Sequence, residues 1–171
     1  MKHAKSVLGS AIALTLLSGC GSSNSGTPVP SGIATASGYS ISVFAQAPSS
    51  TSRPDSIEQM GNTVFIAYQN AGEVKDGSVP GVQNAVVQYD LSGNVMKTYS
   101  VPGHVDGLLA RTDTSTLWAM ANEDGNPELT IIDLVNGSQI TYQATVNPTA
   151  HGGGYDDMQL INGVVYVTAS N

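Results

Sequence analysis

The stretch His151–Asp157, HGGGYDD, gathers residue types that could do chemistry. It supplies one imidazole, a run of glycine amides and the adjacent carboxylates of Asp156 and Asp157. Glycine amides can point at a developing oxyanion, whereas an imidazole beside carboxylates can bind calcium or zinc. Each chemistry also needs groups from elsewhere in the chain, so the surrounding elements decide between them.

The HGGG string resembles the oxyanion-hole motif of lipases and esterases. Those enzymes also carry a nucleophilic serine in a G-x-S-x-G turn farther along the chain. This sequence contains no such turn and no alternation of strands with helices, so the residues disfavour an esterase. The stretch also matches no known metal-binding loop. The spacing of His151, Asp156 and Asp157 matches no calcium loop of the EF-hand type.

Residues 1–19, MKHAKSVLGSAIALTLLSG, have the pattern of a signal peptide. Lys2 and Lys5 precede an apolar run from Val7 to Leu17. That run is too short to cross a hydrocarbon core about 30 Å thick, so we expect a cleaved signal rather than a membrane-spanning helix.

The end of this segment, Leu17-Ser18-Gly19-Cys20, resembles the lipobox of bacterial lipoproteins. The resemblance implies a diacylglyceryl group on Cys20, cleavage before it, and acylation of its new amino group, with palmitate as a typical acyl chain. Several acyl chains would anchor the protein stably in membrane lipid of the bacterial cell envelope. Gly21 after the cysteine favours the outer over the inner membrane of a Gram-negative cell. Cys20 is the only cysteine, which excludes an internal disulfide.

Residues 20–38 are rich in Gly, Ser, Thr and Pro, and we predict a flexible tether behind the lipid. The rest of the chain alternates short apolar segments with glycine-containing turns, which is typical of all-β proteins. All 13 acidic residues follow Cys20, whereas two of the 6 basic residues precede it. This negative charge argues against a nucleic-acid partner, because phosphate binding needs clusters of Lys and Arg.

Three segments of the chain repeat one another. Each opens on a turn with an aspartate, has an apolar residue two positions later, and reaches an alternating apolar strand after a short turn. The segments are residues 53–70, 104–125 and 154–171, with Asp55, Asp106 and Asp156 at matching positions. Two more segments, 85–94 and 129–137, match each other and run from a strand through an Asp-containing turn into another strand.

Each complete unit therefore holds four strands, which is typical of a β-propeller blade of roughly 40–50 residues. The pattern resembles six-bladed propellers of the NHL and gluconolactonase-like type. We predict an all-β fold: a partial β-propeller of four-stranded antiparallel blades, about two and a half of them, in residues 39–171.

A ring needs about four to eight blades. We therefore expect the chain to be the N-terminal part of a longer protein, in preference to a ring closed from several chains. Residues 39–47, YSISVFAQA, are predicted to form a separate strand before the first full unit.

In a propeller, the start of each first strand and the loop after each second strand lie on one face. That face would gather the repeated aspartates. A residue that recurs in every blade is most simply structural, accepting hydrogen bonds from turn amides. The alternative is a divalent cation, the one cofactor these side chains suggest. The candidate metal ligands are Asp55, Asp106, His151, Asp156 and Asp157.

These features predict a membrane-anchored bacterial lipoprotein whose propeller binds a protein or a small molecule at its channel face. No catalytic residue is assigned, because the carboxylates recur with the blades and form no unique constellation. The alternative, which the gluconolactonase-like resemblance implies, is a metal-dependent lactonase-like hydrolase acting at the propeller channel.

Overall fold

The computed structural model describes residues 36–49, 52–70, 83–123, 127–145 and 154–170. The regular structure in these ranges is all β-strand, which confirms the predicted class. No helix in this described part of the chain is long and apolar enough to cross a membrane. Contacts divide the chain into Met1–Val43 and Phe44–Asn171, and the second unit contains the described strands. The signal segment, Cys20 and His151 lie outside the described residues.

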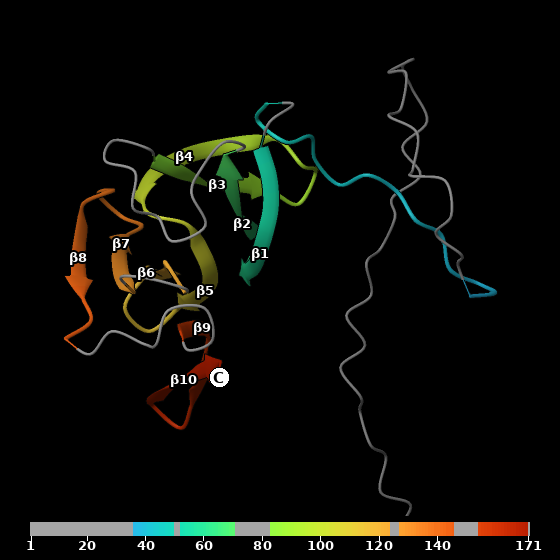
Figure 1. The fold of residues 1–171 in the computed structure, drawn as a ribbon. Coiled ribbons are helices and arrows are strands. Elements are labelled where there is room, and N and C mark those ends of the chain that lie inside the picture. Colours follow the sequence, from blue (N-terminus) through green and yellow to red (C-terminus); the bar gives the residue numbers. More distant parts are fainter. Residues whose placement is uncertain (1–35, 50–51, 71–82, 124–126, 146–153, 171) are drawn as a thin grey trace, which may run out of the picture. The chain divides into compact units, whose positions relative to one another are not determined.

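The first unit of the repeat forms a four-stranded antiparallel sheet, called sheet 1 (Figure 1). Neighbouring strands in the sheet are also consecutive in the chain, so each pair is joined by a direct connection. The strands are β1 (Ser52–Met60), β2 (Thr63–Asn70), β3 (Gln83–Asp90) and β4 (Val95–Pro102).

The second unit forms sheet 2 with the same order, and the third unit forms a two-stranded hairpin. The strands of sheet 2 are β5 (Val105–Arg111), β6 (Thr116–Ala121), β7 (Glu128–Asp133) and β8 (Gln139–Gln143). The hairpin consists of β9 (Gly154–Ile161) and β10 (Val164–Ser170). The predicted four-strand unit is therefore confirmed twice among the described residues.

The turns after β3 and β7 are built alike, as their matching sequences predict. The Oδ1 atom of Asp90 accepts hydrogen bonds from the backbone amides of Ser92 and Asn94, at 2.8 and 2.9 Å. In sheet 2, Oδ1 of Asp133 accepts from the amides of Val135 and Asn136, at 2.8 and 3.2 Å. These side chains satisfy turn amides that no strand partner reaches, so they define where each outer hairpin turns.

Sheets 1 and 2 pack against each other through a core that all four strands of sheet 1 and three strands of sheet 2 reach. Alternate residues of a strand point to opposite faces, so each strand presents one set of apolar side chains to this core. The fully buried members include Phe65, Val86 and Val101 from sheet 1, and Leu117, Ala119 and Ile132 from sheet 2.

The opposite faces of both sheets are apolar as well. Beyond sheet 1, the buried side chains of Tyr68, Val87 and Tyr89 form a second cluster, which Ala45 helps to cover. Beyond sheet 2, Leu109 and Met120 pack with Met158 of the hairpin. Each sheet therefore needs a neighbour on both faces to remove its apolar side chains from water.

The first strands of the repeats lie side by side. Backbone amides of β5 donate hydrogen bonds to side chains of β1: Leu108 to Oγ of Ser56 at 3.1 Å, and Ala110 to Oε1 of Glu58 at 3.2 Å. On the other side of β5, Gly107 lies against the backbone of Asp156 in β9. A Cβ atom at Gly107 would overlap the Asp156 carbonyl oxygen, so this approach requires glycine.

The predicted separate strand at residues 39–47 is wrong, because these residues lie outside any strand. The ring of Phe44 instead meets the ring of Tyr89 in β3 edge to face, with the ring centroids 5.9 Å apart. Alternation of apolar residues favours a strand, but a strand also needs a partner for its backbone groups. Among the described residues, no strand pairs with this segment.

Matched truncations at one repeat position test this packing. Phe65 in β2 is 0% exposed, whereas its counterpart in β10, Tyr166, is 56% exposed. We expect Phe65→Ala to lower the free energy of unfolding by about 3–5 kcal/mol, because it leaves a cavity between the sheets. Tyr166→Ala should cost less than about 1 kcal/mol. Urea unfolding followed by the fluorescence of Trp118 measures both, and equal losses would contradict the arrangement.

Candidate functional site

The three repeated aspartates all lie at β-bulges. In the β1–β2 pair the register shifts between Pro54 and Ile57, so Asp55 and Ser56 face one residue of β2. The β5–β6 register shifts between Val105 and Gly107, at Asp106. The β9–β10 register shifts by the same amount where Asp156 and Asp157 lie. A bulge bends its strand and redirects side chains, so the same device turns all three aspartates.

Asp106 is the best-anchored member of this group. Its Oδ1 atom lies 2.9 Å from Nδ1 of His104, and its Oδ2 atom accepts the backbone amide of Glu123 at 3.0 Å. The Nε2 atom of Gln69, from the end of β2, lies 3.1 Å from the same His104 nitrogen. The end of β2 and the residues after β6 therefore meet at the start of β5.

Two buried asparagines hold the connection between the sheets at this point. The side chain of Asn84 donates a hydrogen bond to the carbonyl of Gly103. Oδ1 of Asn122 accepts the backbone amide of His104 at 2.8 Å, while the Asn122 amide donates to the His104 carbonyl at 2.8 Å. Gly103 and Asn122 both have positive φ, 74° and 64°, a conformation that glycine and asparagine tolerate best. This scaffold fixes the backbone on which His104 sits.

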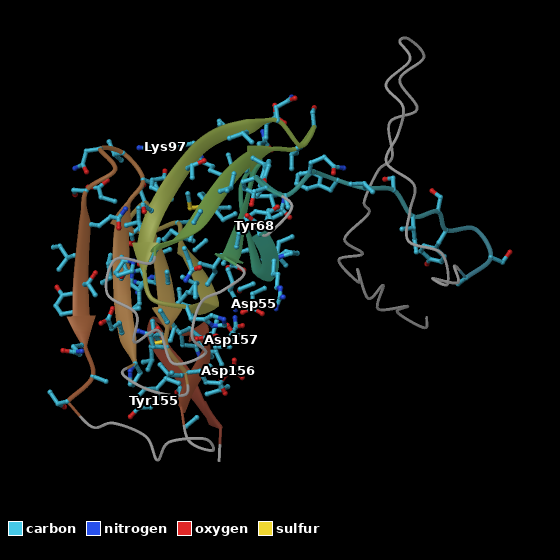
Figure 2. The ribbon with its side chains drawn as sticks, turned by 45° about the horizontal axis from the view of Figure 1, so that its top comes forward. Asp55, Tyr68, Lys97, Tyr155, Asp156 and Asp157 are labelled. Carbon is cyan, nitrogen blue, oxygen red and sulfur yellow. The ribbon has the colours of Figure 1, made fainter. Side chains whose placement is uncertain are left out.

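The carboxylates of the first strands repel one another. Partial loss of hydration raises the pKa of Asp55, and the negative charges of Asp106, Asp156 and Glu123 raise it further. Loss of hydration, followed by Glu123, Asp106 and Asp157, likewise raises the pKa of Asp156. Figure 2 shows Asp55 of β1 grouped with Asp156 and Asp157 of β9. The site is thus an acidic surface at which an added positive charge would relieve repulsion.

Asp157 and Gly154 have roles of their own in β9. Oδ1 of Asp157 accepts the amide of Met158 at 2.8 Å, and its backbone amide donates to Oγ1 of Thr168 at 2.9 Å. Gly154 is buried against Glu123, and a Cβ atom there would overlap the Glu123 carbonyl oxygen. Gly154, the last glycine of HGGG, is thus needed for close packing of β9 against the loop after β6.

The structure brings together four of the predicted site residues: Asp55, Asp106, Asp156 and Asp157. The fifth, His151, lies outside the described residues. Within the described ranges, no group of three or more His, Cys, Asp or Glu side chains is placed to hold a metal ion.

The candidate list omitted His104 and Glu123, which contact Asp106 directly. Their positions in the repeat could have identified them: His104 lies two residues before the repeated aspartate Asp106, and Glu123 follows the second strand of its repeat.

Comparison with known proteins finds no matching family, curated protein or solved structure.

The charge state of Asp55 should affect stability with a defined sign. Folding raises the pKa of Asp55, so the folded protein is more stable when Asp55 is protonated. This contribution to the free energy of unfolding is complete below the ordinary pKa of 3.8 and is lost as the pH rises through the raised pKa. Asp55→Asn should therefore stabilise the protein at pH 7 by about 0.5 kcal/mol after solvent screening, and the difference should vanish near pH 3.

Thermal unfolding across this pH range measures the effect. The control is Asp113→Asn: the Arg111 guanidinium lowers the pKa of Asp113, so its loss should be destabilising at pH 7. A destabilised Asp55→Asn protein at pH 7 would show that Asp55 makes a stabilising bond, contrary to the repulsion described above.

Proposed function

We propose that this chain is a lipid-anchored protein of the bacterial cell envelope whose β-domain forms blades of a propeller and binds a ligand at the acidic end of its inner strands. The observation that carries the binding proposal is the convergence of Asp55, Asp106 and Asp156. They come from three repeats, lie at the same bulge in each, and affect one another's charge.

The propeller proposal is supported by the way the repeats are joined. Each complete repeat is a four-stranded meander, and the first strand of one repeat lies beside the first strand of the next. The sheets pack through equivalent positions, so further repeats would continue the same arrangement around an axis lined by first strands. Loops at one end of such strands form a common binding face, a frequent location of ligand sites.

The charge of this face favours a cationic ligand. The four carboxylates of Asp55, Asp106, Asp156 and Glu123 interact electrostatically, and the positive charge of His104 acts on Asp55 in the opposite direction. Oxygen ligands of this kind suit a divalent cation or an amine group of a protein or small molecule. Since Asp106 also accepts a backbone amide, it combines a structural role with its contribution to the charge.

A metal-dependent hydrolase of the lactonase type is the second candidate. It is favoured by the same carboxylates together with the His104–Asp106 pair, whose nearest atoms are 2.9 Å apart. A bound cation would supply Lewis acidity to a lactone carbonyl. Cation binding without hydrolysis of a lactone would favour the binding domain over the hydrolase.

Calorimetry with calcium, manganese and zinc tests the ligand class. We expect one of these cations to bind to the intact chain. Asp156→Asn should weaken that binding by about tenfold, because it removes one of the negative charges that attract the cation. Asp113→Asn, which changes an exposed carboxylate paired with Arg111, should bind like the parent protein.

A small aldonolactone incubated with the loaded protein then distinguishes a hydrolase from a binding domain. Absence of binding by all three cations would contradict the cation proposal, and lactone hydrolysis lost in Asp156→Asn would favour the second candidate.

The anchoring proposal has a separate test. Cys20→Ala should abolish labelling by a palmitate analogue and release the protein from bacterial membranes, because acylation requires the Cys20 sulfur. Ser23→Ala, beyond the lipobox, should remain labelled and membrane-bound. Labelling of Cys20→Ala to the parent level would overturn the anchor.

A further inference from the structure

A short segment ahead of β1, residues 44–46, lies against β3 and is called the strap. The ring of Phe44 meets the ring of Tyr89 edge to face, and Ala45 packs against the second apolar cluster of sheet 1. The hydroxyl of Tyr89 donates a hydrogen bond to the carbonyl of Gln46 at 3.4 Å. Each residue of the strap therefore contacts sheet 1, although the strap belongs to no strand.

The turn after β3 holds the strap through its backbone. Gly93 in this turn has φ 81°, and a Cβ atom there would overlap the carbonyl oxygen of Phe44. In the corresponding turn of sheet 2, Gly137 has the same φ, but the nearest atom to its Cβ position is Nζ of Lys97 at 2.6 Å. That nitrogen ends a flexible side chain and can move away. Only the first of these two turns is thus closed by a backbone contact that a side chain would prevent.

The strap also completes the hydrogen bonding of two buried tyrosines. The hydroxyls of Tyr68 and Tyr89 lie 3.0 Å apart, and both side chains are buried. A tyrosine hydroxyl donates one hydrogen bond, and that of Tyr89 is directed to Gln46, so Tyr68 donates to Tyr89. Without the strap, the donor of Tyr89 would lose this acceptor, and a buried donor without an acceptor costs free energy. Docking of the strap is therefore favoured by polar as well as apolar contacts.

The strap lies between the predicted tether and β1 in the chain. Before it, Tyr39, Ile41 and Val43 are exposed. After it, β1 begins at Ser52 and carries Asp55 of the acidic end. Tension that enters the chain from the N-terminal side reaches the strap before it reaches β1.

We propose that the strap is the point at which the N-terminal tether joins the folded domain, so that movements of the lipid anchor end at β3 and do not reach Asp55. This inference rests on the proposed acylation of Cys20. Without a docked strap, a pull would act on Ser52 and separate β1 from β2 one pair at a time, starting at Ser52 and Asn70. Asp55 would be among the first residues to move, because it lies three residues into β1.

Limited proteolysis of the intact chain by chymotrypsin, which cleaves after aromatic residues, tests the docking. Tyr39 ahead of the strap is 77% exposed and serves as the internal reference, whereas Phe44 is 36% exposed. Cleavage after Phe44 requires the strap to leave its contacts, so we expect its initial rate to be about tenfold lower than that after Tyr39. Mass spectrometry distinguishes the products, which begin at Ser40 and Ala45.

The two turn glycines provide matched variants. Gly93→Ala and Gly137→Ala introduce the same strain at positive φ, but only the first places a methyl group against the strap. Gly93→Ala should raise the rate of cleavage after Phe44 by about tenfold, and Gly137→Ala should change it by less than about twofold. Circular dichroism reports whether each variant keeps its strands.

Hydrogen exchange at the start of β1 tests the second part of the inference. The turn that contains Gly93 follows Asp90, which pairs with Thr63 at one end of β2, whereas Ser52 of β1 pairs with Asn70 at the other end. Exchange at the start of β1 should quicken by about threefold in Gly93→Ala, because movements of the tether then reach β1, and should stay at the parent level in Gly137→Ala.

Equal rates of cleavage after Phe44 and Tyr39 in the parent chain would overturn the inference, as would equal effects of Gly93→Ala and Gly137→Ala. Unchanged exchange at the start of β1 in Gly93→Ala would also overturn it. None of these measurements requires acylation, so their failure leaves the anchor proposal standing. Failure of the Cys20→Ala test would in turn refute the lipid anchor while leaving the docked strap in place.

Discussion

The structure depends on the packing of sheets that are apolar on both faces. Sheet 1 buries Phe65 and Val86 toward sheet 2, and Val87 and Tyr89 on its other side. A single sheet of this kind cannot shield both faces from water, so its stability comes from its neighbours. The repeat in the sequence meets this requirement, because consecutive repeats supply neighbouring sheets that cover each other's apolar faces.

This requirement also determines where the polar residues gather. Because sheets stack through their faces, their first strands lie side by side, and polar side chains on those strands meet. Asp55, Asp106 and Asp156 occupy equivalent bulges, so their negative charges approach and raise the pKa of Asp55 and Asp156. The acidic end is a consequence of stacking repeats that carry the same aspartate, and the second repeat adds His104 and Glu123.

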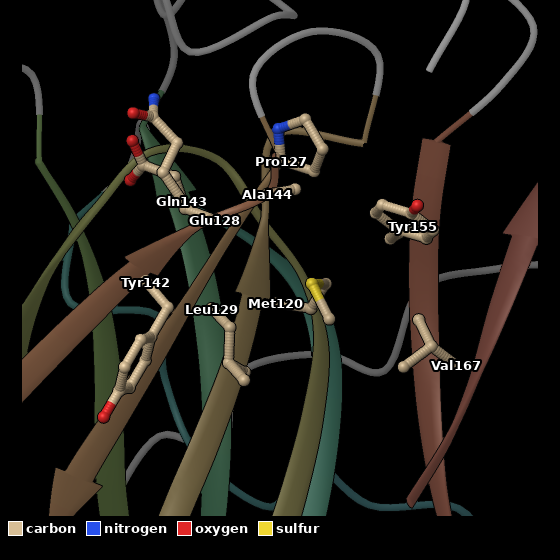
Figure 3. Close-up of a pocket in the computed structure, with 9 residues that line it drawn as sticks. All are labelled: Met120, Pro127, Glu128, Leu129, Tyr142, Gln143, Ala144, Tyr155 and Val167. Atoms are coloured by element: carbon tan, nitrogen blue, oxygen red, sulfur yellow. The ribbon is translucent and has the colours of Figure 1, made fainter. Parts of the chain in front are cut away.

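The two interfaces of sheet 2 differ although their residues correspond. Toward sheet 1, β7 contributes Ile132 and the core is filled. Toward the hairpin, Leu129 and Tyr142 line a groove together with Tyr155 and Val167 (Figure 3). Equivalent sequence positions therefore have different surroundings, because burial depends on what the next repeat places against them.

The local features of this protein can be predicted from single stretches of its sequence. Alternating apolar residues located the strands, aspartate and glycine located the turns after β3 and β7, and the recurrence of Asp55, Asp106 and Asp156 revealed the units. Each of these features depends on residues close together in the chain, so a single sequence can reveal it.

Three features instead arise from contacts between distant segments: the bulges, the His104–Asp106 contact and the difference in exposure between Tyr99 in β4 and its counterpart Tyr142 in β8. It also showed that residues 39–47, despite their alternation, lie outside any strand. All of these depend on which backbone or side chain arrives from another part of the chain. Hydrogen-bond register and burial are properties of pairs of segments, and the pattern of one segment does not contain its partner.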